Sequence, residues 1–401
     1  MEGGALIKKY NSSDTLNLNE QNDEMGAKLL ASGSSSCIFK PFIPCKNTSD
    51  KQTNDKISKI VYGKKSDKYL GQEKTMNNII RKIKGYKSWC LIYDTFCKAP
   101  TYSNIFKNYD KNIIDCLDEI YTEKFNKTNN MLIGDYGGIT FEDYFENNIL
   151  NKKSVKTINK EIYILFKKMA PLFLGLDELY KNKLLHLDIK VNNIVLHNNV
   201  FKYIDFGLSC KLSNNKHLKT RSDSEFNGKR YYLWYPIEYI YSNANNSDLD
   251  YELSKLNSGK TRKHFEKGLK IHKLLNNDFE SNIRNNINDR KMNKNELYSK
   301  IDVYSLGLLI PYLFVDYGIT KYINKSNFLK ELFSFFSEMC NPEYDKRITP
   351  IMCLKIYYTL LKKYSDLNNN NSNKKLSKKI SIKKSKKKKS KKKKLSKNYR
   401  R

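Results

Sequence analysis

The sequence predicts an α+β fold with a small β-rich first part and a larger, mainly helical second part. Short strand patterns bounded by turn residues dominate 26–136, whereas apolar residues at helical spacing dominate 137–360. The chain has 401 residues, of which 39 % are hydrophobic, enough for one two-lobed protein or two small domains. Residues 1–25 are polar and are expected to be flexible. Residues 361–401 are rich in Asn, Ser and Lys, which predicts a disordered basic tail.

The first part holds four segments with the short apolar or alternating pattern of strands. They are 28–39, which reads as two strands around a turn of small residues, 56–62, 91–93 and 131–133. A helix is expected over 72–83, because its Met and Ile residues recur at helical spacing. The polar stretch 101–129 is interpreted as an insertion.

The second part is predicted to begin with a helix over 162–180, in which Pro171 either kinks the helix or breaks it. Two strands follow at 194–196 and 200–204. The residues between them, His197-Asn-Asn199, are typical of a hairpin turn.

Further along, residues 240–300 are polar and rich in Asn and Lys, so we expect an insertion there, although 265–275 keeps some helical periodicity. Residues 302–315 are strongly apolar, which predicts a buried helix. No stretch approaches the roughly 18 uninterrupted apolar residues of a transmembrane helix, so no transmembrane segment is expected. The N-terminus also lacks the apolar core of a signal peptide.

The net charge of +32 is concentrated at the C-terminus. Residues 374–401 contain 17 Lys and Arg and no acid, which leaves +15 on the rest of the chain. Lys-rich runs bind nucleic acid without sequence preference, and they also bind acidic membrane surfaces or importins. Tyr399 is the sole aromatic residue of 374–401, so base stacking is not indicated. The alternative is a tail that only keeps the protein in solution.

The eight cysteines form no CxxC pair and the five histidines form no HExxH pattern, which argues against a zinc centre. Scattered single cysteines in a folded protein predict a reducing, intracellular compartment.

The chemistry is concentrated in His186-Leu-Asp-Ile-Lys-Val-Asn-Asn193 and in Asp205-Phe-Gly207. Phosphoryl transfer requires a carboxylate for the attacking hydroxyl, cations for the phosphate charge and ligands for Mg²⁺. Asp188 can accept the hydroxyl proton, and Lys190 can reach the moving phosphate. Asn193 and Asp205 carry the oxygen ligands that Mg²⁺ prefers, and the predicted hairpin would bring both to one end of its strands.

These residues resemble the HRDxKxxN and DFG motifs of eukaryotic-type Ser/Thr protein kinases. Lys190, two residues after Asp188, is typical of the Ser/Thr kinases. Downstream, Asp302-Val-Tyr-Ser-Leu-Gly307 resembles the start of the buried helix whose Asp holds the catalytic loop. Pro236-Ile-Glu238 resembles the APE motif, whose Glu pairs with a late Arg, here Arg347.

The resemblance implies a bilobal kinase fold, with an N-lobe over 26–136, a C-lobe over 137–360 and ATP between them. Mg²⁺ would be the metal and protein Ser or Thr hydroxyls the acceptors. The phosphate-binding loop is expected at Ala31, Ser32, Gly33, Ser34, Ser35 and Ser36. Of the usual glycines only Gly33 is kept, but small residues still let backbone N–H groups approach phosphate.

Lys59, in Ile57-Ser-Lys59, resembles the lysine that binds the α- and β-phosphates, with Lys56 as the second candidate. Glu73 is expected to orient Lys59, although Asn77 stands where the family usually packs Leu or Met. Gly134 to Tyr136 resemble the hinge that offers backbone bonds to adenine, and Gly137 and Gly138 its flexible exit.

Leu187 replaces the Arg of HRD, which in the family receives an activation-loop phosphate. We therefore expect weak dependence on phosphorylation of Thr220, Ser222 and Ser224. The activation segment, 205–238, is also basic, which suggests acidic or prephosphorylated substrates or only a solvated loop. The basic residues are Lys216, Lys219, Arg221, Lys229 and Arg230.

Two other classes of function fit parts of the pattern. The altered phosphate loop is compatible with a pseudokinase scaffold, although Asp188, Asn193 and Asp205 argue against it. A kinase for small molecules would usually lack the activation segment. The 240–300 insertion and the Asn, Lys and Ile bias resemble putative kinases of large DNA viruses, which would place the protein in a host cell or virion. The Lys-rich tail would then be a candidate nuclear import signal.

Overall fold

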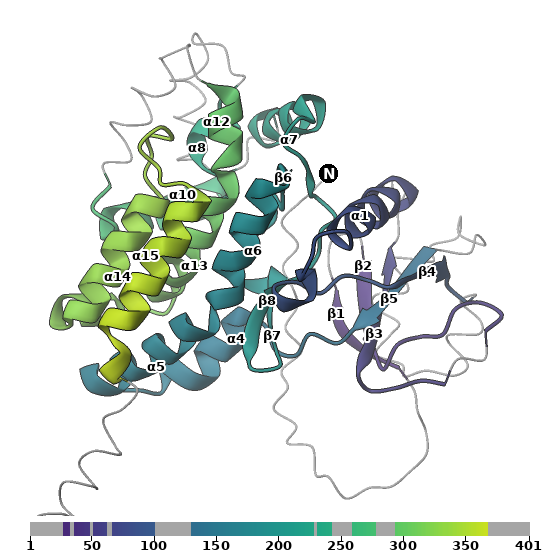
Figure 1. Ribbon diagram of the computed structural model, residues 1–401, viewed down its shortest axis with the longest axis horizontal. Coiled ribbons are helices and arrows are strands. Elements are labelled where there is room, and N and C mark those ends of the chain that lie inside the picture. The colour runs from purple at the N-terminus through teal and green to yellow at the C-terminus, as the bar shows by residue number, and fades with distance from the viewer. Residues whose placement is uncertain are drawn as a thin grey trace, which may run out of the picture.

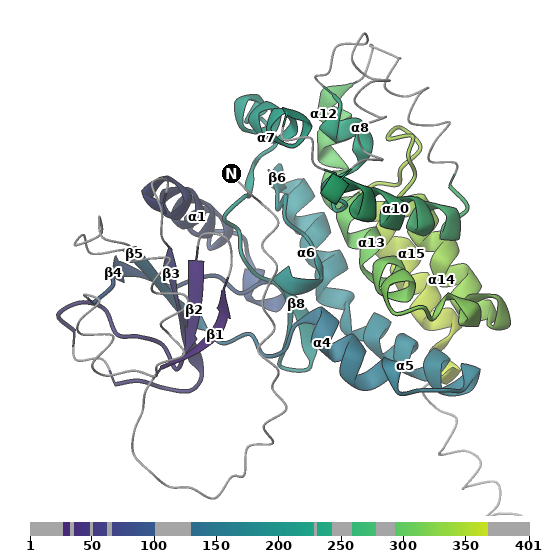
Figure 2. The same ribbon diagram turned by 180° about the vertical axis from the view of Figure 1, so that it is seen from behind.

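The computed structural model describes eight stretches of the chain. They are 27–32, 36–48, 51–61, 66–100, 130–227, 231–242, 259–277 and 293–367. A β-sheet region and a larger helical region lie side by side (Figures 1 and 2), which confirms the predicted α+β class. The expectations for residues 1–25, for the insertion 101–129 and for the basic tail from 368 onward concern residues outside this description.

The N-terminal region is a five-stranded antiparallel sheet in the order β1-β2-β3-β5-β4. Its strands are β1 Lys28–Ser32, β2 Ser36–Lys40, β3 Lys56–Val61, β4 Thr95–Lys98 and β5 Asn130–Asp135. Helix α1, Ser66–Ile80, packs against the sheet, where its Leu70 is buried with Val61 of β3 and Leu132 of β5 (Figure 1). The predicted strand pair at 28–39 and the strand and helix that follow it are therefore confirmed.

The strand expected at 91–93 is wrong, because β4 begins at Thr95. The backbone N–H of Leu91 donates instead to Tyr203 in the helical region, 2.9 Å away. Asp94 then donates to Ile133 of β5 at 2.9 Å. Residues 91–94 therefore pass from one region to the other, and their hydrogen bonds are divided between the two.

The expectation of unpaired cysteines is also wrong. Cys45 and Cys97 form a disulfide that joins the segment after β2 to β4, across 52 positions of sequence. Disulfides are rare in reducing compartments, so the cysteines do not support the predicted reducing compartment. Within the described ranges Cys90, Cys210, Cys340 and Cys353 are free and buried.

Two helices replace the one expected at 162–180. Helix α5, Val155–Lys168, ends at Met169, and α6, Ala170–Lys181, begins with Pro171 in its first turn. Proline has no N–H to donate, and the first turn of a helix is where none is needed. Of the two alternatives for Pro171, a break is the one that occurs.

Helix α13, Ile301–Asp316, is buried along nearly its whole length, as predicted. The other helical elements of the described ranges are η1 Tyr86–Ser88, α4 Phe141–Phe145, η3 Glu146–Leu150, η4 Val191–Asn193, α7 Asn215–Asn227, α8 Ile237–Ile240, α10 Gly259–Leu274, α12 Lys294–Ser299, η5 Thr320–Lys325, α14 Asn327–Met339, α15 Pro350–Lys363 and η6 Ser365–Leu367. Gly307 lets α13 approach α14 closely, since a side chain there would collide with Met339 and Cys340. No helix in the described part of the chain is long and apolar enough to cross a membrane.

Helix α10 lies within the predicted insertion 240–300 and covers most of the stretch 265–275 where helical periodicity is expected. Phe265, Ile271 and Leu275 are buried in the same core as α13. His272 is buried too, and its Nε2 lies 3.0 Å from the hydroxyl of Tyr304 on α13. The stretch 259–275 is thus part of the core of the helical region.

Candidate active site

The catalytic loop runs from His186 to Asn193, between the short strand β6, Leu184–Leu185, and β7, Ile194–His197. Asp302, at the start of α13, accepts hydrogen bonds from the backbone N–H groups of His186 at 2.6 Å and Leu187 at 3.0 Å. Leu187 has a left-handed backbone, with φ of 59°. Because few L-residues adopt that conformation without support, the two bonds to Asp302 hold the loop in a shape it would not keep alone.

His186 fixes the loop from its other side. The backbone N–H of Asp188 donates to His186 Nδ1 at 3.3 Å, which leaves Nε2–H to donate to the carbonyl of Ile204 at 3.1 Å. The ring also packs on Phe206, with ring centroids 4.6 Å apart. His186 thus couples the catalytic loop to the residues on both sides of Asp205.

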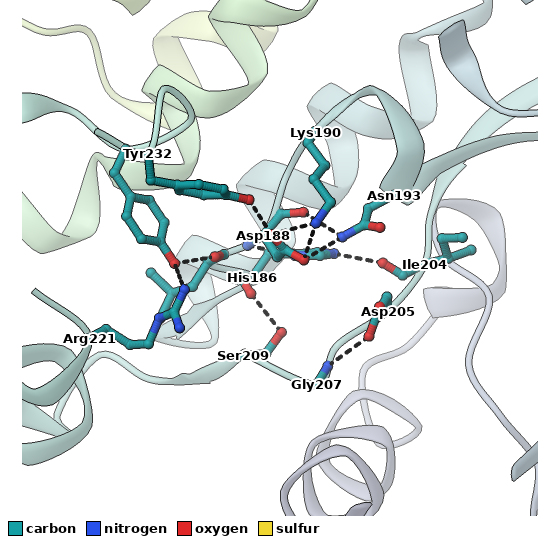
Figure 3. Close-up of polar contacts among 12 residues, drawn as sticks. His186, Asp188, Lys190, Asn193, Ile204, Asp205, Gly207, Ser209, Arg221 and Tyr232 are labelled. Carbon is teal, nitrogen blue, oxygen red and sulfur yellow. Dashed lines mark hydrogen bonds and ion pairs between the residues drawn. The ribbon is translucent and has the colours of Figure 1, made fainter. Parts of the chain in front are cut away.

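The carboxylate of Asp188 is surrounded by donors (Figure 3). Lys190 Nζ lies 3.1 Å from Oδ1 and 2.9 Å from Oδ2. Asn193 Nδ2 donates to Oδ2 at 2.6 Å, and the hydroxyl of Tyr232 donates to Oδ1 at 2.6 Å. The structure thus brings Asp188, Lys190 and Asn193 together, as the sequence predicts, and adds Tyr232, which no motif in the sequence indicates.

The hairpin of β7 and β8, Val200–Tyr203, brings Asn193 close to Asp205. The backbone N–H of Ile204 donates to the carbonyl of Asn193 at 3.1 Å. Asn198 and Asn199 form the hairpin turn with positive φ, as the predicted turn requires. Asn193, at the start of β7, is therefore held next to the residue that precedes Asp205.

These two side chains fit a cation that prefers oxygen ligands. Both hydrogen bonds of the Asn193 side chain use its amide nitrogen, so in the described part of the chain its amide oxygen is not engaged. The Asp205 side chain remains 36 % exposed. The described ranges contain no group of three or more His, Cys, Asp or Glu that could hold a metal. An ion here would thus have two protein ligands and take the others from phosphate and water, as Mg²⁺ commonly does.

Lys59 on β3 bridges the two regions of the molecule. Its Nζ lies 3.3 Å from Glu73 Oε2 on α1 and 3.0 Å from Asp205 Oδ1. Lys59 is buried, whereas Lys56, the second candidate, is not. The arrangement selects Lys59 of the two lysines.

Electrostatics in this trio follow from burial and from the shared cation. Burial opposes the charge on Lys59, but Asp205 and Glu73 outweigh it and raise the pKa of Lys59 well above its usual value. Burial raises the pKa of Glu73 to about 7, against the opposing effect of Lys59. Burial would also raise the pKa of Asp205, but Lys59, with help from Lys190 and His186, lowers it to about 2. Asp205 is therefore ionised at neutral pH.

The expected phosphate-binding loop is only partly described. Ala31 and Ser32 end β1 and Ser36 begins β2, with Ala31 paired to Ile38 and Ser32 to Cys37. Gly33, Ser34 and Ser35 lie outside the described residues. The role of this loop in binding phosphate therefore stays a prediction.

The expected hinge follows β5, and one of its residues is already engaged. The N–H of Tyr136 donates to the carbonyl of Asp55 at 2.7 Å, and the backbone bonds to adenine stay a prediction. Gly137 and Gly138 are required where they stand, because side chains there would collide with Val195 and with the carbonyl of Leu196. The two glycines thus allow the chain to pass close to β7.

Asn77 is fully buried on α1, and its amide nitrogen and oxygen have no partner among the described residues. Asn77 stands where the kinase family usually has Leu or Met, so a buried polar group without a hydrogen bond replaces an apolar side chain four residues after Glu73.

The basic rim expected on the activation segment is smaller than predicted. Arg221 on α7 points inward, and its Nη2 lies 3.2 Å from the hydroxyl of Tyr235 and 3.4 Å from Glu225 Oε1. Lys219 pairs with Asp223 at 2.5 Å. Lys229 and Arg230 lie outside the described residues.

The model of the protein kinase domain family matches residues 90–250, which include the catalytic loop and Asp205. This part of the chain is thus similar to a protein kinase domain. No curated protein matches it. The match ends before Asp302 and begins after Lys59 and Glu73, so the structure is what connects these three residues to the kinase-like core.

Proposed function

We propose that the chain is a protein kinase that transfers the γ-phosphate of ATP to Ser or Thr hydroxyls of proteins. The observation that carries the proposal is the assembled site: Lys59 contacts both Glu73 and Asp205, while the Asp188 carboxylate is held within reach of Asn193. In kinases the Lys–Glu ion pair and the metal-binding Asp must both be in place for transfer.

Each residue has a part in the proposed mechanism that its surroundings support. Asp188 orients the attacking hydroxyl and accepts its proton as the new P–O bond forms, while the bond from the γ-phosphorus to the β–γ bridging oxygen breaks and ADP leaves. Lys190, 29 % exposed and bound to Asp188, can turn to the γ-phosphate and offset its charge. Lys59 binds the α- and β-phosphates while Glu73 holds it in position. Mg²⁺, when bound by Asp205 and Asn193, would neutralise charge on the phosphates.

The preference for Ser and Thr is supported by Lys190, which resembles the lysine of the Ser/Thr kinases. Protein substrates are implied by the kinase domain match together with the activation segment. Binding of nucleic acid or acidic surfaces by the Lys-rich tail, nuclear import and a viral source stay predictions.

The test is transfer from labelled ATP with Mg²⁺ to casein, myelin basic protein and the chain itself, followed by phosphoamino-acid analysis. Wild type should label Ser or Thr, and Asp188→Asn and Asp205→Ala should each reduce the rate at least about 100-fold. Asp366→Asn, at an exposed carboxylate in η6, is the matched control and should keep wild-type activity. Phosphotyrosine as the product would refute the Ser/Thr assignment. ATP that raises the melting temperature without any transfer would favour the pseudokinase.

A further inference from the structure

Tyr232 makes a direct contact with the proposed catalytic base. It belongs to the activation segment, and its hydroxyl lies 2.6 Å from Asp188 Oδ1. Figure 3 shows it reaching Asp188 from the side opposite to Asn193. Burial, followed by the charge of Asp188, raises the pKa of Tyr232 well above its usual value, so the hydroxyl keeps its proton and acts as the donor.

The contacts of Asp188 account for all the acceptor positions of a carboxylate. The two oxygens together offer about four lone pairs. Lys190 takes one on each oxygen, Asn193 takes another on Oδ2 and Tyr232 takes another on Oδ1. A substrate hydroxyl can therefore bind Asp188 only after one of these donors has left.

Lys190 is the donor best suited to leave. Its ammonium is partly exposed on a flexible stem, and a nucleotide phosphate would attract it. Asn193 cannot leave easily, because its Nδ2 also donates to the backbone carbonyl of Asp188 at 2.9 Å. Tyr232 would then be the donor that stays on Oδ1.

The surroundings of Tyr232 are built to hold it still. Its ring packs edge-on against Tyr235, with centroids 4.8 Å apart, and its carbonyl accepts the N–H of Tyr235 at 3.0 Å. The hydroxyl of Tyr235 donates to the carbonyl of Leu187 at 2.7 Å, and Arg221 donates to that hydroxyl. The residue before Asp188 is thereby held at its carbonyl by Tyr235 and at its N–H by Asp302.

We propose that Tyr232 is a positioning residue that keeps the Asp188 carboxylate oriented when Lys190 moves to the nucleotide phosphate. The position vacated by Lys190 then receives the substrate hydroxyl, while Tyr232 and Asn193 fix the two oxygens. Arg221 and Tyr235, both in the activation segment, support the contact between Tyr232 and Asp188, because Tyr235 packs on Tyr232 and holds the residue before Asp188. The inference rests on the proposed kinase function.

The opposite role makes a different prediction. If Tyr232 instead occupied the place of the substrate hydroxyl, removing its oxygen would open the site. Its loss would then raise kcat or lower the KM for the protein substrate.

The experiment compares Tyr232→Phe with Tyr239→Phe in the full chain, by steady-state kinetics with varied ATP and casein. Both variants lose one tyrosine hydroxyl, and Tyr239 directly follows the activation segment, but its hydroxyl donates to the carbonyl of Leu218 at 2.8 Å and does not touch Asp188. We expect Tyr232→Phe to lower kcat about 10- to 100-fold, as the loss of a hydrogen bond to a charged group would. The KM for ATP should stay within about twofold, and Tyr239→Phe should keep the wild-type kcat. Melting temperatures of both variants report whether the fold is retained.

An increased or unchanged kcat in Tyr232→Phe would overturn the inference. So would a decrease that Tyr239→Phe reproduces, because the effect would then be structural. An inactive wild type would remove the proposed function and this inference with it, whereas an active wild type that tolerates Tyr232→Phe would overturn the inference alone.

Discussion

Replacing Arg347 with Met tests how the activation segment is anchored to the helical region. Arg347 is 1 % exposed and forms an ion pair through Nη2 with Glu238, which is 2 % exposed and lies on α8 at the end of that segment. Its Nε also donates to the carbonyl of Asn341 at 3.0 Å. Methionine keeps much of the bulk but leaves a buried carboxyl group without a partner.

The expected loss is large because both groups are out of water. Removing one partner of a buried ion pair typically costs about 3–5 kcal/mol. A domain of this size loses about 2–4 °C of melting temperature per kcal/mol. Arg347→Met should therefore melt about 12 °C below wild type.

The loss of stability in Arg347→Met should also depend on pH. Burial raises the pKa of Glu238 even with Arg347 opposing it, so between the unfolded and the folded pKa the folded protein binds more protons than the unfolded chain. Stability then falls as pH rises from the unfolded pKa of about 4.3 through the folded pKa. Without Arg347 the folded pKa rises further, and the deficit of Arg347→Met should be larger at pH 8 than at pH 5.

The assay is thermal unfolding across that pH range, with two comparison variants. Arg347→Lys keeps the charge and should lose less. Lys363→Met breaks an exposed ion pair with Glu331 and should cost at most about 1 kcal/mol. If Arg347→Met loses no more than Lys363→Met, or if its deficit does not grow with pH, the proposed anchoring is refuted.

Two further predictions concern a buried histidine and the activation segment. Burial, followed by the charge of Arg347, lowers the pKa of His272 to about 3. The stabilisation that comes from the neutral, buried His272 is therefore complete above pH 6.5 and is lost as pH falls towards 3. In His272→Gln, the free energy of unfolding measured with urea should therefore fall less steeply below pH 6.5 than in wild type. An unchanged slope would contradict this. Combined Ala substitutions at Thr220, Ser222 and Ser224 should leave at least about half of the transfer activity, because contacts such as that of Arg221 hold the segment without a phosphate. Ser222 is itself buried with its hydroxyl donating to two carbonyls, so the same variant should lose a few degrees of melting temperature, while complete loss of activity would refute the prediction.

The sequence was most informative where the chemistry is local. The residues from His186 to Asp205 occupy one loop and one hairpin, so their spacing alone was enough to predict which side chains converge. Lys59 was chosen over Lys56 by resemblance, and the structure places Lys59 between Glu73 and Asp205 because β3 and α1 pack there.

The sequence is least informative where distant segments share hydrogen bonds, as at 91–94, whose backbone bonds are divided between two regions. Residues 240–300 are polar on average, and only the helical periodicity at 265–275 indicates the residues that α10 buries in the same core as α13. The disulfide between Cys45 and Cys97 depends on two segments meeting in the folded sheet, for which the sequence contains no spacing signal.

By itself the sequence determined the α+β class and predicted that the side chains of Asp188, Lys190 and Asn193 come together, because each depends on a few consecutive side chains. Only the tertiary structure decided which donors saturate Asp188. Tyr232 is 44 positions from Asp188 in the chain, and no periodicity connects two residues whose contact is made by the folding of the activation segment onto the catalytic loop.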